Sequence, residues 1–261
     1  MYVKESAEIG GRELTIEMGK LARQADGAAV ITYGETSVLV TAVMEREPKD
    51  VPFLPLTVDY REYTYAGGRI PGGFFKREGR PTEREILTAR MTDRPIRPLF
   101  PDGYSHETQI IGLVLSADDE NRPDIHCITG ASTALYCSRI PFTTPIATVR
   151  VGMIDGELIL NPTVQQMEES DLDLIVTSRR DSVVMIEGGA NEVSEAQIVE
   201  AMEFAQPAIN TLIDLQQRIY DQLNPTKFEV AADPMDPAII ERTESAIGGA
   251  IHEALGVVDK I

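Results

Sequence analysis

The feature that most constrains the fold is the repeated pairing of β-rich runs across short turns. Three segments have this form, and a strong hairpin signal, Asp155-Gly156, lies inside the second. They are residues 28–44 (AAVITYGETSVLVTAVM), 145–162 (PIATVRVGMIDGELILNP) and 172–189 (LDLIVTSRRDSVVMIEGG). Because strands outnumber helical patterns as far as about residue 190, the sequence predicts an α+β fold with mostly antiparallel or mixed sheets.

Three more strands and a helix are predicted in the first 120 residues. The strands are expected within residues 11–19, 53–63 and 106–117. A helix is expected over residues 82–94, where Thr82 and Glu85 have the spacing of a capping box. Because the residue before a proline disfavours the α region, we expect this helix to end before Pro95 and residues 94–101 (RPIRPLFP) to run extended.

The rest of the pattern is mainly helical. Residues 124–140 carry small side chains on one side, which suits close packing on a sheet, and residues 195–223 form one long helix or two, with Pro207 as the expected break. A further helix is expected over residues 238–258, and because the chain ends inside this pattern we expect a longer protein. The expected domains are residues 1–230 and the start of an all-helical segment at 235–261.

Charge is distributed unevenly along the 261 residues. The net charge is −18, which by itself disfavours binding to a polyanion. Residues 76–97 nevertheless contain seven Lys or Arg against four Asp or Glu, a net charge of +3, which leaves −21 for the rest of the chain. A basic segment on an acidic body predicts a localised anion-binding site.

Cysteine content and hydropathy indicate a reduced, cytoplasmic protein without a membrane segment. Cys127 and Cys137 are ten residues apart on a predicted helix, about 15 Å along its axis, which is too far for a disulfide. No run of eighteen apolar residues occurs, and the N-terminus lacks the apolar core of a signal peptide.

Common catalytic and metal-binding motifs are absent. The sequence has no P-loop, no GxGxxG between a strand and a helix, no CxxC, no HExxH and no GxSxG. Its three histidines, His106, His126 and His252, are isolated. None of the common hydrolase or dehydrogenase constellations can therefore be assembled from these residues.

The glycine-rich loop at residues 67–83 (GGRIPGGFFKREGRPTE) contains the adjacent rings Phe74 and Phe75. Either the rings pack into a local core, or at least one is exposed as a platform on which the bases of a single strand stack. In the second case Lys76 and Arg77 would hold phosphates.

An arginine row follows the loop. Arg90 and Arg94 are four residues apart and share a helix face, and Arg97 follows Pro95. These arginines either form salt bridges with neighbouring acids or extend the anion site. Together with the aromatic pair, they favour a single-stranded nucleic-acid site.

Two long motifs identify a family resemblance. YAGGRIPGGFFKREGRPTE and LTARMTDRPIRPLFPDGY, supported by DIHCITGASTAL and SDLDLIV, resemble the first ribonuclease PH-like domain of the polynucleotide phosphorylase family. The resemblance covers residues 5 to 230 and implies the ribosomal protein S5 domain 2-like fold of mixed sheets and packed helices. The tail from residue 235 is similar to the start of the family's helical linker domain.

The resemblance implies a function. The family enzymes are longer homotrimeric rings with a second ribonuclease PH-like domain and KH and S1 domains, and they take part in mRNA turnover. They degrade single-stranded RNA from the 3′ end with inorganic phosphate and Mg²⁺, releasing nucleoside diphosphates, and partners from the RNA-degradation machinery are implied. The implied RNA-binding positions are Phe74, Phe75, Lys76, Arg77, Arg80, Arg90, Arg94 and Arg97. Lys76 departs from the family's commoner arginine and loses its planar fork.

Two departures from the family's catalytic pattern place the active site elsewhere. Asn121-Arg122-Pro123-Asp124 stands where the catalytic domain has a serine-rich phosphate cradle, and Gln165 stands six residues before Asp171 in place of the family's first metal-binding aspartate. The resemblance therefore implies that Mg²⁺ binds outside this chain. The alternative for the isolated chain is a non-catalytic RNA-binding and ring-scaffold module, and a small-molecule transferase is disfavoured because no helix follows the first glycines of the loop directly.

Overall fold

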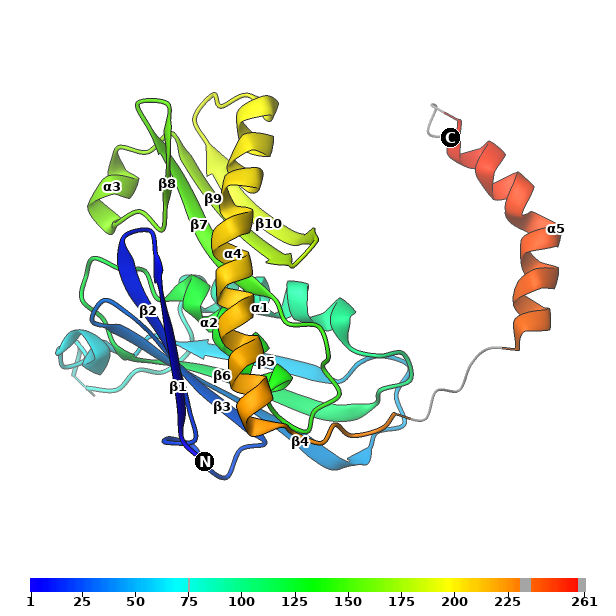
Figure 1. Cartoon of the computed structure of the whole chain (residues 1–261), viewed down its shortest axis with the longest axis horizontal. Helices are drawn as coiled ribbons and strands as arrows, with labels where there is room; N and C mark the ends of the chain where they lie inside the picture. The colour runs from blue at the N-terminus through cyan, green and yellow to red at the C-terminus, as the bar shows by residue number, and fades with distance from the viewer. Residues whose placement is uncertain (75, 231–235, 258–261) are drawn as a thin grey trace. The chain divides into compact units, whose positions relative to one another are not determined.

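The computed structural model describes residues 1–74, 76–230 and 236–257 (Figure 1). The chain divides into two compact units, residues 1–229 and 230–261. The first unit holds both β-sheets and the helices that pack on them, and the described part of the second unit, residues 230 and 236–257, holds one helix.

The larger sheet has six strands in the order β1-β2-β3-β4-β6-β5. Its strands are β1 (Val3–Ile9), β2 (Arg12–Met18), β3 (Gly27–Tyr33), β4 (Thr36–Pro48), β5 (Leu56–Arg61) and β6 (His106–Ser116). All neighbours are antiparallel except β5 and β6, which are parallel. The predicted mixed sheet is therefore confirmed, while β1 is a strand that the sequence pattern did not predict.

The smaller sheet has four antiparallel strands in the order β10-β9-β7-β8. They are β7 (Ala147–Ile154), β8 (Glu157–Leu160), β9 (Leu172–Arg179) and β10 (Ser182–Ala190), with the short helix α3 (Val164–Glu168) between β8 and β9. Both predicted hairpins are present, and Asp155 and Gly156 both have positive φ in the turn between β7 and β8, as a tight hairpin requires.

Helix α2 (Asp124–Tyr136) forms the centre of the core, and all of its residues are buried. It packs on β3, β4 and β7. A Cβ atom at Gly130 would lie 2.6 Å from Val40 Cγ2, so the glycine allows the helix to approach the sheet closely. This confirms the expectation drawn from the small residues of the segment.

Helix α4 (Glu195–Leu223) is a single helix that runs through Pro207, so the expected break is wrong. Pro207 has no amide hydrogen to donate to the Glu203 carbonyl, and both residues are exposed, so the lost hydrogen bond lies on the solvent side of the helix. Burial of the opposite face against β1, β7 and β9 keeps the helix continuous. The Gln216 side chain, two turns before the end of α4, accepts from the Ser132 hydroxyl at 2.8 Å inside the core.

Helix α1 (Glu83–Ile96) begins with the predicted capping box between Thr82 and Glu85. Its predicted end is wrong, because Pro95 lies inside the helix, and residues 97–99 form the 3-10 helix η2 (Arg97–Leu99) in place of an extended segment. Arg97 explains the difference. Its guanidinium bonds the Asp93 carboxylate one turn back and the carbonyls of Leu54 and Leu56, so tertiary contacts hold the last turn past the proline.

The second unit contains α5 (Pro237–Leu255), which Asp236 caps by accepting from the Ala238 amide. None of its residues is buried. Its assignment to the start of a helical linker domain stays a prediction. In the described part of the chain, no helix is long and apolar enough to cross a membrane.

Candidate nucleic-acid interface

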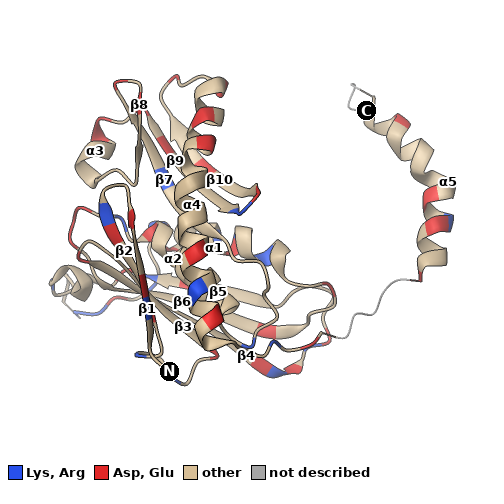
Figure 2. Ribbon diagram, in the orientation of Figure 1, with Lys and Arg blue, Asp and Glu red and all other residues tan. Residues whose placement is uncertain are grey.

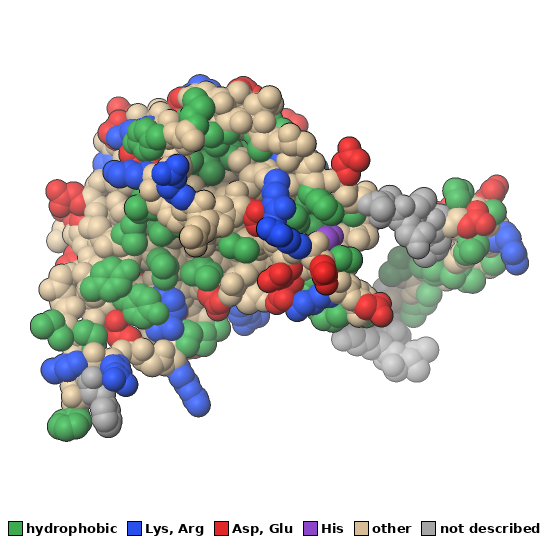
Figure 3. All heavy atoms as spheres, turned by 90° about the horizontal axis from the view of Figure 1, so that it is seen from below, with side chains coloured by type: hydrophobic (Ala, Val, Ile, Leu, Met, Phe, Trp, Pro, Cys, Tyr) green, Lys and Arg blue, Asp and Glu red, His purple; other side chains and the backbone are tan. Residues whose placement is uncertain are grey.

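The glycine-rich loop joins the 3-10 helix η1 (Thr64–Gly67) to α1 and is exposed along most of its length. Phe74 is 93% exposed, so its ring is on the surface of this chain and outside any local core. Lys76, Arg77 and Arg80 are exposed beside it. Phe75 lies outside the described residues. Figure 3 shows hydrophobic and basic side chains close together at this end of the molecule, at lower left.

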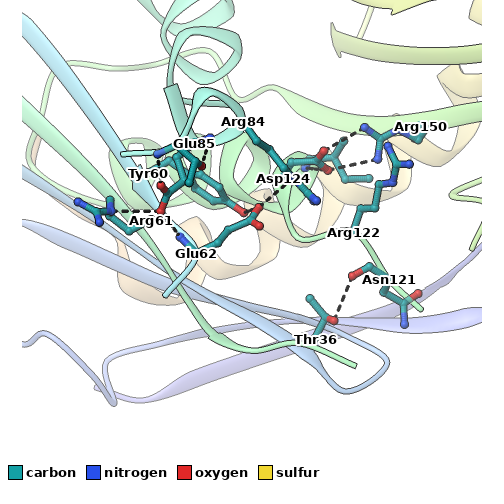
Figure 4. Close-up of polar contacts among 12 residues, drawn as sticks. Thr36, Tyr60, Arg61, Glu62, Arg84, Glu85, Asn121, Arg122, Asp124 and Arg150 are labelled. Carbon is teal, nitrogen blue, oxygen red and sulfur yellow. Dashed lines mark hydrogen bonds and ion pairs between the residues drawn. The ribbon is translucent and has the colours of Figure 1, made fainter. Parts of the chain in front are cut away.

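A buried carboxylate, Glu85, fastens the two ends of the loop together (Figure 4). On the side that enters the loop, it accepts from Arg61 Nε at 3.1 Å and from the Glu62 amide at 2.8 Å. On the side that leaves the loop, it accepts from the Thr82 amide at 2.6 Å. Burial raises the pKa of Glu85, but these amides, the Thr82 hydroxyl and the Arg61 charge outweigh it and hold the pKa below its usual value.

Two further contacts fix the base of the loop. The Glu78 carboxylate accepts from the Thr64 amide at 2.7 Å, and Arg61 Nη2 donates to the Gly79 carbonyl at 3.3 Å. The base of the loop is thus attached to the end of β5 and to η1, while its tip carries Phe74.

A groove of about 530 Å³ between α1 and β10 extends the basic surface from the loop. Four arginines line it, together with three acids. The arginines are Arg84, Arg90, Arg94 and Arg122, and the acids are Glu83, Asp124 and Glu187. The structure therefore brings Arg90 and Arg94 together with two arginines that the sequence did not single out. Arg122 is distant from α1 in the chain, and no local pattern could have paired them.

The predicted arginines Arg90, Arg94 and Arg97 differ in what they contact. Arg94 forms an exposed ion pair with Glu187 at 2.6 Å, and Arg90 is exposed. Arg97 holds the end of α1, because its guanidinium donates to the Asp93 carboxylate and to the carbonyls of Leu54 and Leu56. These hydrogen bonds already occupy the guanidinium within this chain. An RNA contact by any of these residues remains a prediction.

A buried ion pair between the start of α2 and β7 takes the place of an open anion cradle. Arg150 Nη2 lies 3.0 Å from Asp124 Oδ2 (Figure 4). Its Nε lies 2.8 Å from Asp173 Oδ1, and Arg122 adds a contact to Asp173 at 3.6 Å. Burial raises the pKa of Asp124, but the Arg150 charge outweighs it and keeps the carboxyl ionised. The positive charge of Arg150 is therefore compensated by Asp124 and Asp173 of this chain.

The carboxylates near this pair do not suit a divalent cation. Asp173 is already compensated by Arg150 and Arg122, and the Asp171 carboxylate accepts from the Asn191 amide side chain at 3.3 Å. Across the described ranges, no group of three or more His, Cys, Asp or Glu could hold a metal ion. The donor set thus does not fit Mg²⁺, which favours several oxygen ligands without adjacent cations.

Comparison with known proteins decides the family. Two models of the 3′ exoribonuclease family match the chain, domain 1 over residues 10–141 and domain 2 over residues 144–208. The chain belongs to the 3′ exoribonuclease family. Both sheets and the four helices α1 to α4 of the first unit lie within or next to these two ranges, so the two models together describe one ribonuclease PH-like domain.

Relatives confirm the more specific resemblance. A polyribonucleotide nucleotidyltransferase of Myxococcus xanthus is 56% identical over 271 residues, covering 99% of this chain and 38% of the relative. Enzymes of the same name from Sorangium cellulosum and Staphylococcus aureus are 47% and 52% identical, covering 100% and 91% of this chain and 34% of each relative. The chain therefore spans about a third of the length of these 3′ exoribonuclease family members.

A solved structure confirms the predicted fold. A chain of the Archaeoglobus fulgidus exosome with RNA bound to the active site matches with a TM-score of 0.62 at 18% identity, covering 80% of this chain and 88% of that chain. At this identity the match shows the shared α+β, ribonuclease PH-like fold alone.

Proposed function

We propose that this chain is the N-terminal part of a phosphorolytic 3′-to-5′ exoribonuclease that degrades single-stranded RNA in the cytoplasm. In this proposal the chain builds part of a homotrimeric ring and guides RNA, and residues 235–261 begin a helical linker. Phosphate attack and Mg²⁺ binding occur in a second domain outside this chain, and the ring associates with the RNA-degradation machinery. The family match and the relatives support the reaction class.

The observation that carries the guiding role is the basic and aromatic surface of the glycine-rich loop on an otherwise acidic chain. Figure 2 shows patches of Asp and Glu scattered over many of the helices, strands and loops, in keeping with the net charge of −18. Against this background, Phe74 is exposed beside Lys76 and Arg77, and the arginine groove lies along the following helix. Repulsion by the acidic body would confine RNA to this surface.

In this proposal, one group of residues contacts the bases of the RNA and another contacts its phosphates. Phe74 offers a face on which any base can stack, so binding does not depend on sequence. Lys76, Arg77, Arg80, Arg90 and Arg94 neutralise phosphates, which makes the affinity salt-dependent. Mg²⁺ bound in the catalytic domain would supply charge neutralisation for the transferred phosphoryl group, and no residue of this chain is assigned to that step.

Phosphorolysis measured on two proteins tests the proposal. The 261-residue chain and the full-length protein are each incubated with poly(A), phosphate and Mg²⁺, and nucleoside diphosphates are measured. We expect release by the full-length protein and none by the chain. Release by the chain would show that its active site is internal, and no release by the full-length protein would overturn the reaction class.

The isolated chain has a second candidate function as a non-catalytic RNA-binding and ring-scaffold module. The exposed loop favours this second function, because the hydrogen bonds of Glu85 that fasten the two ends of the loop lie wholly within this chain. Binding of labelled oligo(A) to the chain in the absence of phosphate tests this function. The absence of binding at low salt would exclude it.

A further inference from the structure

Three side chains form a column next to the base of the glycine-rich loop. The Arg61 guanidinium carbon lies 4.6 Å from the centre of the Tyr63 ring. The Tyr63 ring in turn stacks on the Tyr65 ring, with 5.8 Å between centroids and 22° between planes. Tyr65 ends the column and is 52% exposed. One face of the column is thus covered by a cation, and the other ends in an aromatic ring open to solvent.

The column is held in place by the backbone of η1. The Ala117 amide at the end of β6 donates to the Ala66 carbonyl at 3.0 Å, and the Gly68 amide donates to the Tyr65 carbonyl at 2.9 Å. Gly68 has φ 67°, the left-handed conformation that glycine adopts easily and that ends this short helix. Glu85 fixes the other end of the column through Arg61. Tyr65 therefore stands on a hydrogen-bonded turn, with its ring packed on the Tyr63 ring.

A second groove lies beside the column and has a volume of about 370 Å³. Its lining includes Tyr63, Thr64, Arg69, Arg84 and Arg122. Arg84 and Arg122 also line the α1–β10 groove, so the two grooves share a wall.

The second groove offers guanidinium groups to a phosphate. Its acids Glu62 and Asp119 are compensated by Arg84 at 3.4 Å and Arg69 at 3.6 Å. Tyr65, at the end of the adjoining column, adds an exposed aromatic face for a nucleobase.

We propose that Tyr65 is a stacking platform for one nucleobase of single-stranded RNA, in addition to the ring at the tip of the glycine-rich loop. The proposal rests on the proposed RNA-guiding function and adds a second binding position to it. Arg61 and Tyr63 support the platform from behind, and the shared groove leads the phosphate backbone toward Arg84 and Arg122.

The test uses the full-length protein and a 12-nucleotide oligo(A) in which 2-aminopurine replaces adenine at one position, scanned along the strand. Stacking on a tyrosine quenches the fluorescence of this base, whereas phosphate contacts alone do not. We expect 2-aminopurine at one position of the strand to lose its fluorescence quenching in Tyr65→Leu and to keep it in Tyr65→Phe. This position should differ from the one whose quenching is lost in Phe74→Ala. The affinity of Tyr65→Leu should fall about 5-fold or more.

One control variant and three further outcomes make the result decisive. Tyr2 is 51% exposed and precedes β1 at the opposite edge of the larger sheet from β5, so Tyr2→Leu removes an equally exposed ring at another place. Unchanged quenching and affinity in Tyr65→Leu, with a loss in Phe74→Ala, would overturn the platform and leave the proposed function standing. No loss in either variant would overturn both. Dissociation of the ring by Tyr65→Leu in sedimentation, with all quenching positions retained, would assign Tyr65 to a protein interface and overturn the platform.

Discussion

Arg61 Nε donates to the Glu85 carboxylate at 3.1 Å and so joins the end of β5 to the start of α1. The same guanidinium covers the Tyr63 ring and donates to the Gly79 carbonyl. One contact between residues 24 positions apart thus couples the cap of a helix, the base of the glycine-rich loop and the aromatic column. The first prediction follows from this coupling.

Glu85→Gln should loosen the loop without unfolding the domain. The amide can accept fewer hydrogen bonds than the carboxylate and turns two donors toward the donors of Thr82, Glu62 and Arg61. We expect a loss of about 1–3 kcal/mol in the free energy of unfolding, faster hydrogen exchange in residues 62–82 and weaker RNA binding. The matched control is Glu83→Gln, an exposed acid in the same helical turn. Equal effects of the two variants would show that the change in net charge, and not the loss of the Glu85 hydrogen bonds, alters the stability and RNA binding of the loop.

Acid should destabilise the first unit as its ionised carboxylates are protonated. Burial raises the pKa of Asp118, but hydrogen bonds from Asn121, Glu120 and Glu35 outweigh it and lower the pKa to about 2; the pKa values of Glu85 and Asp124 are also lowered. Because folded values lie below unfolded values of about 4, the contribution is complete above pH 4 to 5 and is lost as the pH falls through the folded values. Urea unfolding between pH 7 and pH 2.5 measures it. Stability that stays constant from pH 5 to pH 2.5 would contradict the assigned shifts.

Phe74→Ala should weaken RNA binding and leave thermal stability unchanged. The ring is 93% exposed, so its removal costs little packing, whereas one lost stacking contact is worth about 1–3 kcal/mol of binding free energy. Phe53→Ala is the matched control, because Phe53 is also an exposed ring but lies in the segment before β5, at the opposite end of this strand from the loop. Fluorescence anisotropy with oligo(A) measures the affinity. A lower melting temperature for Phe74→Ala would instead indicate a packing role.

The sequence predicted the features that depend on neighbours in the chain. The capping box of Thr82 and Glu85 and the turn at Asp155 and Gly156 need only residues a few positions apart, and both are present. Pro95 and Pro207 were misleading because local proline rules do not include the tertiary contacts that hold α1 and α4.

The sequence predicted the residues at the tip of the glycine-rich loop but not the contacts at its base. The composition of the glycine-rich loop identified Phe74 as a candidate, but the partners of Glu85 lie across the chain. The same is true of Arg122, which reaches the groove of α1 only through the fold. Strand β1 was missed because four of its seven residues are polar, and its pairing with β2 and packing on α4 determine its structure.

The buried pair of Asp124 and Arg150 provides the last prediction. Both side chains are less than 10% exposed, so Arg150→Met leaves the Asp124 carboxylate without its main compensating charge inside the core. Breaking one partner of such a pair costs about 3–5 kcal/mol, whereas replacing both with apolar side chains is often neutral. We therefore expect Arg150→Met to be strongly destabilised and the double variant Asp124→Leu/Arg150→Met to recover most of the loss, since Asp173 keeps its contact with Arg122. Urea unfolding of the two single variants and the double variant gives the coupling energy. Additive effects would mean that the two residues act independently. They would contradict the assignment of Arg150 as the main compensating charge of Asp124.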